Sequence, residues 1–213
     1  MINHRTVWLG LVLTALALLL SGCTGNTPLK LPFSDNFDDA QSGWGVDQSE
    51  AFERGYRDGE YFIQIQSPNW FMWTSPSAEV GDIAAEADLY LAPTYANGYA
   101  GLLCRHKDRE NFYYFAISPA GYYAIFRRVG GGDLQILTGG GSARYSEAIR
   151  QGERVNHVKA ICRGDVLSLY VNGEMVESVT DTAHSIGDVG IGVASGPEGD
   201  TRFHFDNFEA TQP

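Results

Sequence analysis

The chain has 213 residues, of which 44% are hydrophobic and 12% aromatic, and its formal net charge at pH 7 is −11. This length predicts a single ordinary domain. The acidic balance, without any cluster of Lys and Arg, argues against nucleic acid and anionic lipid surfaces as partners.

Residues 1–22 have the pattern of a secretory signal peptide. Arg5 gives a positive start, and the apolar run from Val7 to Leu20 is too short to span a bilayer. The run ends in Leu20-Ser21-Gly22-Cys23, which resembles the lipobox of bacterial lipoproteins, where the signal is cut before an acylated cysteine. We therefore expect export and a membrane-lipid anchor on Cys23, in the cell membrane or outer membrane, facing the periplasm or the exterior. An ordinary cleaved signal, or an uncleaved anchor with a chance cysteine, is the alternative.

The exported part divides into a lipidated cysteine with a short tether, residues 23–32, and a folded domain, residues 33–213. Once Cys23 carries lipid, Cys104 and Cys162 remain. In an oxidising compartment we expect these two to form a disulfide across a separation of 58 residues. Two buried thiols on separate strands are the alternative.

Short strands separated by turn residues follow one another through the domain. Residues 82–91 alternate most clearly, with Ile83 and Ala85 on an apolar face and Glu86 and Asp88 on the other. The other expected strands are 51–56, 60–66, 70–74, 99–106, 112–118, 122–129, 134–138, 156–163, 166–172, 175–179, 189–194 and 202–210. No window predicts an amphipathic helix of more than two turns. This series predicts an all-β fold, a two-sheet antiparallel sandwich.

Several phrases resemble one known family when they are taken in order. They include Phe33-Ser34-Asp35-Asn36-Phe37, Tyr56-Arg57-Asp58-Gly59-Glu60-Tyr61, Asn111-Phe112-Tyr113-Tyr114-Phe115, Leu169-Tyr170-Val171-Asn172-Gly173 and Phe205-Asp206-Asn207-Phe208. Over about residues 33–211 the chain is similar to the concanavalin A-like jelly roll of lectins, laminin G-like domains and glucanases. The similarity is closest to laminin G-like and 3-keto-disaccharide hydrolase-like domains of exported bacterial proteins. It implies a jelly roll, but a shared fold does not transfer an activity.

The resemblance also implies a structural calcium ion. In related sandwiches an aspartate of the final strand, matched here by Asp206, binds calcium together with carbonyl oxygens of the first strand and of an early hairpin glycine. Asn36 and Gly59 match those places, and such a mixture of oxygen ligands suits calcium. The alternative is that Asp206 caps the first strand by hydrogen bonds without metal. No other cofactor is expected to be required.

Catalytic patterns are incomplete in this sequence. A glucanase of this fold resembles Glu-x-Asp-x-x-Glu, because retaining hydrolysis needs two carboxylates about 5 Å apart. The near match from Glu86 to Leu91 has Leu91 in place of the final glutamate, so one of the two catalytic carboxylates is missing. No Gly-x-Ser-x-Gly motif is present, and no histidine spacing supports zinc. We therefore lean away from an enzyme and keep a glycoside hydrolase-like protein acting on modified sugars as an alternative.

Aromatic residues on both faces of single strands give the remaining functional hint. They occur in Trp70-Phe71-Met72-Trp73, in Phe112-Tyr113-Tyr114-Phe115 and in Tyr122-Tyr123. One face of each strand can fill the core, so the other must lie on a second surface. Exposed rings on a concave sheet can stack on pyranose faces while polar side chains bond the hydroxyls. The candidate ligand-binding residues are Trp70, Trp73, Arg105, Tyr113, Tyr123 and Arg127.

Two explanations of these aromatics that involve no ligand stay open: a loop can cover them, or they can form ordinary cross-strand pairs. The preferred function is non-catalytic binding of carbohydrate or of another envelope or extracellular ligand. A protein-binding adhesion or scaffold module is the third hypothesis.

Overall fold

The computed structural model describes residues 30–77 and 79–213. The expected signal peptide, Cys23 and most of the tether lie outside the described residues. Within the described part of the chain, the regular structure consists of β-strands and one 3-10 turn, η1 (Thr138–Gly140). No helix in that part is long and apolar enough to cross a membrane.

Sheet A contains nine of these strands. Eight follow the order β14, β13, β12, β6, β16, β4, β3 and β2, and β1 pairs with the end of β16. Their bounds are Phe33–Asp35 (β1), Asp47–Gln48 (β2), Phe52–Arg57 (β3), Glu60–Ile65 (β4), Ile83–Leu91 (β6), Asn156–Arg163 (β12), Val166–Val171 (β13), Glu174–Thr180 (β14) and Thr201–Thr211 (β16).

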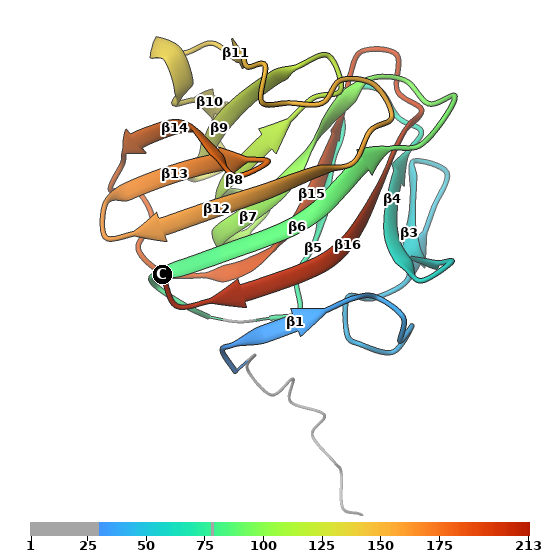
Figure 1. Ribbon diagram of the computed structural model, residues 1–213, viewed down its shortest axis with the longest axis horizontal. Coiled ribbons are helices and arrows are strands. Elements are labelled where there is room, and N and C mark those ends of the chain that lie inside the picture. Colours follow the sequence, from blue (N-terminus) through green and yellow to red (C-terminus); the bar gives the residue numbers. More distant parts are fainter. Residues whose placement is uncertain (1–29, 78) are drawn as a thin grey trace, which may run out of the picture.

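Sheet B contains the other seven strands. Six follow the order β10, β9, β8, β7, β15 and β5, and β11 pairs with β9. Their bounds are Phe71–Thr74 (β5), Gly98–Asp108 (β7), Asn111–Ile117 (β8), Tyr122–Arg128 (β9), Gln135–Ile136 (β10), Arg144–Tyr145 (β11) and Asp188–Ser195 (β15). Figure 1 shows the two sheets as layers, with β12, β6 and β16 of sheet A in front of β7, β8 and β15 of sheet B. The expected all-β, two-sheet antiparallel sandwich is confirmed.

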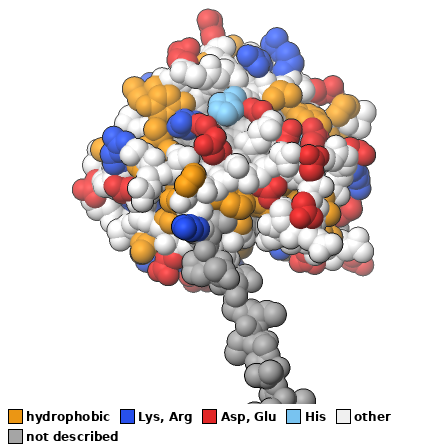
Figure 2. Space-filling model, turned by 60° about the horizontal axis from the view of Figure 1, so that its bottom comes forward, with side chains coloured by type: hydrophobic (Ala, Val, Ile, Leu, Met, Phe, Trp, Pro, Cys, Tyr) orange, Lys and Arg blue, Asp and Glu red, His pale blue; other side chains and the backbone are white. Residues whose placement is uncertain are grey.

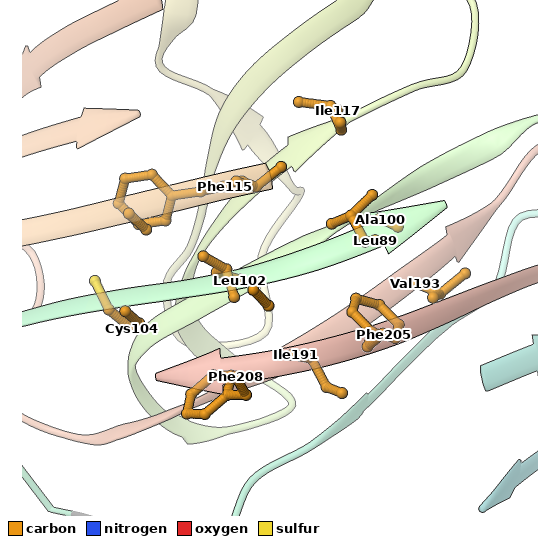
Figure 3. Close-up of a cluster of buried hydrophobic side chains, with 14 of the residues drawn as sticks. Leu89, Ala100, Leu102, Cys104, Phe115, Ile117, Ile191, Val193, Phe205 and Phe208 are labelled. Carbon is orange, nitrogen blue, oxygen red and sulfur yellow. The ribbon is translucent and has the colours of Figure 1, made fainter. Parts of the chain in front are cut away.

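The main core fills the space between the sheets because each central strand turns apolar side chains toward the other sheet, and on β6, β12 and β16 of sheet A these alternate with more exposed side chains. On β6, for example, Ala85, Ala87 and Leu89 are buried, whereas Glu86 and Asp88 are partly exposed. Figure 3 shows how inward side chains of both sheets meet. Those labelled there are Leu89, Ala100, Leu102, Cys104, Phe115, Ile117, Ile191, Val193, Phe205 and Phe208.

The expected disulfide between Cys104 and Cys162 is present, with a Cα–Cα distance of 6.8 Å. Cys104 lies on β7 of sheet B and Cys162 on β12 of sheet A. The bond therefore joins the two sheets through the core.

Candidate functional site

The outer face of sheet B carries a second apolar cluster, separate from the main core. We call it the aromatic face. Small residues, among them Gly101, Gly192 and Ala116, lie between its rings on β7, β15 and β8. The rings belong to Phe71, Trp73, Tyr99, Phe112, Tyr114 and Phe126, which come from β5, β7, β8 and β9.

The rings of the aromatic face lie against one another across the sheet. Phe71 and Trp73 are nearly parallel, at 20° with centroids 5.7 Å apart, and Phe71 also stacks on Phe112 at 5.2 Å. Tyr114 stacks on Phe126 at 5.7 Å. Aromatic contacts at such distances are worth about 0.5–1.5 kcal/mol each beyond the area that they bury. The face is therefore a continuous layer of packed rings.

Burial divides this layer into a closed part and an open part. Phe112 and Tyr114 are each only 1% exposed. The Tyr114 hydroxyl donates to the carbonyls of Tyr99 and Gly192, at 3.0 and 3.1 Å, and burial raises the Tyr114 pKa well above its usual value. Phe71 and Trp73 are only half-buried. An incoming ligand can thus reach the β5 end of the face.

A hollow of about 410 Å³ adjoins that open end. His106 connects the two, since its ring packs on Trp73 with centroids 5.1 Å apart and also lines the hollow. Burial lowers the pKa of His106 to about 4, so its imidazole is neutral at physiological pH. The other lining residues are Glu79, Lys107, Ile186, Gly187 and Asp188. We call this space the end hollow; it places polar groups beside the stacked rings.

Trp70 and Trp73 are two expected ligand-binding residues that reach the surface at or beside β5. Trp73 belongs to the aromatic face itself. Trp70 directly precedes β5 and is 45% exposed. Its backbone N–H donates to the Ser195 hydroxyl at 3.0 Å, which ties this position to the end of β15.

Tyr113 and Tyr123 occupy the opposite face from the one we expected. Both lie in the main core between the sheets, 0% and 6% exposed. Their neighbours Phe112 and Tyr114 form the second surface instead. The Tyr113 hydroxyl donates to Asp181 and accepts from the His184 N–H. Burial, with the neighbouring Asp181 carboxylate, raises the pKa of Tyr113 to about 12. Neither tyrosine can stack on a ligand outside the sandwich.

Arg105 is also an interior residue, which differs from the expectation. It follows Cys104 at an irregularity in the pairing of β7 with β8 and has a φ of 51°. Its side chain is 2% exposed and donates to the carbonyls of Gly81, His184 and Gly164, and to the Asp82 carboxylate. The guanidinium therefore holds three loops together and has no free edge for a ligand.

The Arg127 side chain also makes its hydrogen bonds within the protein. Its guanidinium bonds the Asp181 carboxylate and the Gln135 side chain. The Asp181 pKa is lowered because the hydrogen bonds from Tyr113, Ala183 and Arg127 outweigh the burial that would raise it. The six expected residues thus do not form one site: Trp73 belongs to the aromatic face, Trp70 is exposed before β5, and the other four support the interior or its rim.

The outer face of sheet A is polar, and we call it the polar face. Cross-strand pairing brings together His157 and Asp88, then Asp88 and Asp206. His157 Nδ1 lies 2.9 Å from Asp88 Oδ1, and Asn207 donates to Asp88 Oδ2 at 3.0 Å. Figure 2 shows one surface of the molecule, on which acidic, basic and hydrophobic side chains are interspersed and a histidine is visible among them.

A second network on the polar face centres on Glu60. Its Oε2 accepts from the Tyr90 hydroxyl at 2.7 Å and lies 2.8 Å from His204 Nδ1, while Tyr90 and His204 stack at 5.1 Å. Burial and the Glu60 carboxylate raise the Tyr90 pKa. Burial also lowers the His204 pKa, although Glu60 opposes that shift. The network holds two rings and a carboxylate in fixed positions.

The three residues expected to bind calcium converge on Asp38. Asn36 donates to Asp38 Oδ2 at 2.6 Å, and a Cβ added to Gly59 would lie 3.0 Å from Asp38 Oδ1. The Asp206 pKa is raised by burial and by the carboxylates of Glu60, Asp88 and Asp38. Among the described residues, no group of three or more His, Cys, Asp or Glu is arranged to hold a metal. The carboxylates of Asp38 and Asp206 and the side-chain oxygen of Asn36 are oxygen ligands of the kind that suit a hard cation such as calcium.

Carboxylates are distributed unevenly between the two faces. The near match to a glucanase motif, Glu86-Ala87-Asp88, lies on the polar face. Asp and Glu are absent from the segments that build the aromatic face, which are 71–74, 98–104, 111–117, 122–128 and 189–195. These segments therefore contribute no carboxylate to the stacked rings, whereas Glu79 and Asp188 line the end hollow beside them.

No family model matches the chain, and no curated protein matches it. Solved structures match it over most of its length. A carbohydrate-binding module, CBM66 from Bacillus subtilis, is 20% identical, with a TM-score of 0.55 over 80% of this chain and 92% of that one. A β-glucanase of Bacillus licheniformis is 10% identical, with a TM-score of 0.58 over 85% and 98%. A non-specific endo-β-1,3(4)-glucanase is 9% identical, with a TM-score of 0.58 over 88% and 95%. At these identities the likeness shows the jelly-roll fold alone.

Proposed function

We propose that this chain is an exported, lipid-anchored jelly roll that binds carbohydrate on the aromatic face without cleaving it. The observation that carries the proposal is the half-buried pair of Phe71 and Trp73, whose parallel rings lie beside the end hollow. Flat apolar rings next to a few polar groups are the usual means of binding a sugar ring. Lys107 and Glu79 supply such polar groups in the end hollow.

The fold of the neighbours supports the same function. Their names describe a carbohydrate-binding module and glucanases. Segments 71–74, 98–104, 111–117, 122–128 and 189–195 carry no carboxylate, which favours binding over hydrolysis on the aromatic face, because retaining and inverting glycosidases both place two carboxylates across the scissile bond.

A glycan array tests the proposal directly. The full chain in detergent is compared with Trp73→Ala and with Tyr145→Ala, a substitution of a 52% exposed aromatic on β11. We expect glycan binding by the wild type and by Tyr145→Ala, and a loss of about tenfold or more in affinity for Trp73→Ala. Equal binding by all three proteins would contradict the aromatic face as the binding site.

Chromogenic glycosides separate binding from catalysis. We expect no turnover by the wild type. Turnover that disappears in Glu79→Gln or Asp188→Asn would instead make the end hollow an active site. If neither glycans nor glycosides interact, a protein partner becomes the better explanation.

Lipid anchoring and calcium complete the proposal. Cys23 carries the anchor, and the pair Cys104–Cys162 is then free to form the disulfide between the sheets. Mass spectrometry of the mature amino terminus tests the anchor, and an unmodified Met1 would exclude it. Calcium is proposed to bind where Asp206, Gly59 and Asn36 converge on Asp38, holding the first and last strands together.

A further inference from the structure

The polar face contains a hollow that the proposed function leaves unused. It has a volume of about 400 Å³ and is lined by Glu86, His157, Lys159, Ile161, Tyr170 and Gly173. We name it the β12 hollow, since three of these side chains belong to β12. We propose that the β12 hollow is a second binding site, which takes one neutral sugar ring. It lies on sheet A and needs no contribution from the aromatic face.

The register of three neighbouring strands sets the shape of this site. Lys159 on β12 pairs with Tyr170 on β13 and with Glu86 on β6. Neighbouring strands lie about 4.8 Å apart, so an aromatic ring, an ammonium and a carboxylate follow one another over about 10 Å. That length matches one pyranose or furanose ring with its hydroxyls. Ile161, two residues along β12 from Lys159, adds apolar area on the same side.

The hydrogen-bonding groups of the β12 hollow complement adjacent hydroxyls. Lys159 Nζ lies 2.7 Å and His157 Nε2 lies 3.7 Å from Glu86 Oε2, so both of these contacts use the same oxygen of the Glu86 carboxylate. An ammonium has three donors, so Lys159 keeps donors for a ligand. One hydroxyl can donate to Glu86 Oε1 while its neighbour accepts from Lys159, and the ring face packs on Tyr170. His157, with Nε2 3.7 Å from Glu86, borders the same position.

The charges around the hollow exclude charged sugars. An anionic ring would approach Glu86, Asp88 and Asp206, which outnumber the single ammonium of Lys159. A cationic ring would find Glu86 already paired with Lys159, and Asp88 bonded through both oxygens to His157 and Asn207. A neutral ring meets no such charge repulsion and does not have to break either of these existing pairs.

Size and accessibility agree with this ligand. The volume falls within the range of about 300–1,000 Å³ that is usual for small-molecule sites. His157 and Lys159 are 43% and 36% exposed, so their polar ends reach solvent. Gly173, in the turn between β13 and β14, has no neighbouring atom within 4 Å of an added Cβ, which leaves that side of the hollow open.

Saturation-transfer NMR tests the site in isolation from the aromatic face. The full chain carrying Trp73→Ala is mixed in detergent with glucose, galactose, mannose, fructose or N-acetylglucosamine. Glucuronate serves as the anionic counterpart of glucose. The same background then receives Tyr170→Ala, Glu86→Gln or the control Tyr145→Ala, each checked for an unchanged melting profile.

We expect transfer to at least one neutral sugar in the Trp73→Ala background and no transfer to glucuronate. Affinity should fall about tenfold or more in Tyr170→Ala and in Glu86→Gln, and remain unchanged in Tyr145→Ala. Any one of three results would overturn the proposal. These are no saturation transfer to any of the five neutral sugars, binding of glucuronate equal to that of glucose, or an unchanged sugar affinity in both Tyr170→Ala and Glu86→Gln. Binding that is lost on Trp73→Ala alone would support only the aromatic face, so the two proposals fail separately.

Discussion

Phe71 and Phe112 lie on strands three places apart in sheet B, yet their ring centroids are only 5.2 Å apart. Three strand spacings amount to about 14 Å, so both rings must lean inward over the strands between them. Gly192 permits this approach, because an added Cβ there would lie 3.1 Å from the Phe71 ring. The aromatic face is thus partly a small core of its own, with a ligand-accessible margin at β5.

Tyr114 is the polar anchor of this small core, and its hydroxyl gives the first prediction. Tyr114→Phe removes the one hydroxyl proton that the carbonyls of Tyr99 and Gly192 share. We expect the free energy of unfolding to fall by about 1–2 kcal/mol, since buried carbonyls lose their partner. Urea unfolding measures this, with Tyr122→Phe as a control on a ring that is 44% exposed. Equal effects of the two substitutions would show that the Tyr114 hydroxyl bonds contribute nothing.

The fold could be predicted from the sequence because strand alternation and turn residues are local signals. Residues 156–163, for example, form β12 with the expected bounds. The face of each aromatic could not be assigned in the same way, since the rings of Phe112, Tyr113 and Tyr114 can each pack into an apolar cluster. One signal could have decided it. Cys104 must face the core to bond Cys162, and Tyr113 is its cross-strand partner, which places Tyr113 inside as well.

Arg105 shows a different limit of sequence reasoning. Regular alternation after Cys104 puts it on the outer face, but the left-handed φ of 51° at the strand irregularity turns its side chain inward. Three loop carbonyls accept its donors only once the tertiary fold exists. The β12 hollow was missed for the same reason, because its residues come from separate strands and carry no common motif.

Arg105 should therefore affect stability rather than ligand affinity. Arg105→Lys keeps the charge but cannot reach all the carbonyls that the guanidinium bonds. We expect a loss of at least about 2 kcal/mol in unfolding free energy, because several buried acceptors lose a charged donor. Arg109→Lys, at a side chain that is 77% exposed, is the matched control and should change little. A stable Arg105→Lys protein with weakened glycan binding would contradict this assignment.

The disulfide should be a large contributor to stability. The bond closes a separation of 58 residues, for which the chain-entropy relation gives about 4 kcal/mol. We expect the double variant Cys104→Ala/Cys162→Ala to unfold at a clearly lower urea concentration than the wild type. Reductant should lower the stability of the wild type and leave the double variant unchanged. If reductant lowers the stability of both proteins equally, the loss is not caused by reduction of the Cys104–Cys162 disulfide.

Asp206 should make the stability of the fold depend on pH and calcium together. Burial and the carboxylates of Glu60, Asp88 and Asp38 raise its pKa in the folded state above the ordinary value of 3.8. The folded protein therefore binds this proton more tightly than the unfolded chain does. The stabilisation from that proton is fully present below the unfolded pKa and is lost as pH rises through the folded pKa.

Asp206→Asn removes the repulsion and keeps an acceptor for the Asn207 N–H, which lies 2.7 Å from Asp206 Oδ1. With chelator present, we expect the variant to gain up to about 1 kcal/mol over the wild type at about pH 7, and no advantage at about pH 3. Excess calcium should reverse the order at neutral pH, because only the wild type offers the full carboxylate to the ion. Urea unfolding at the two pH values, with calcium or chelator, measures both effects. A wild type that calcium does not stabilise would exclude the metal, while the pH effect tests the carboxylate repulsion on its own.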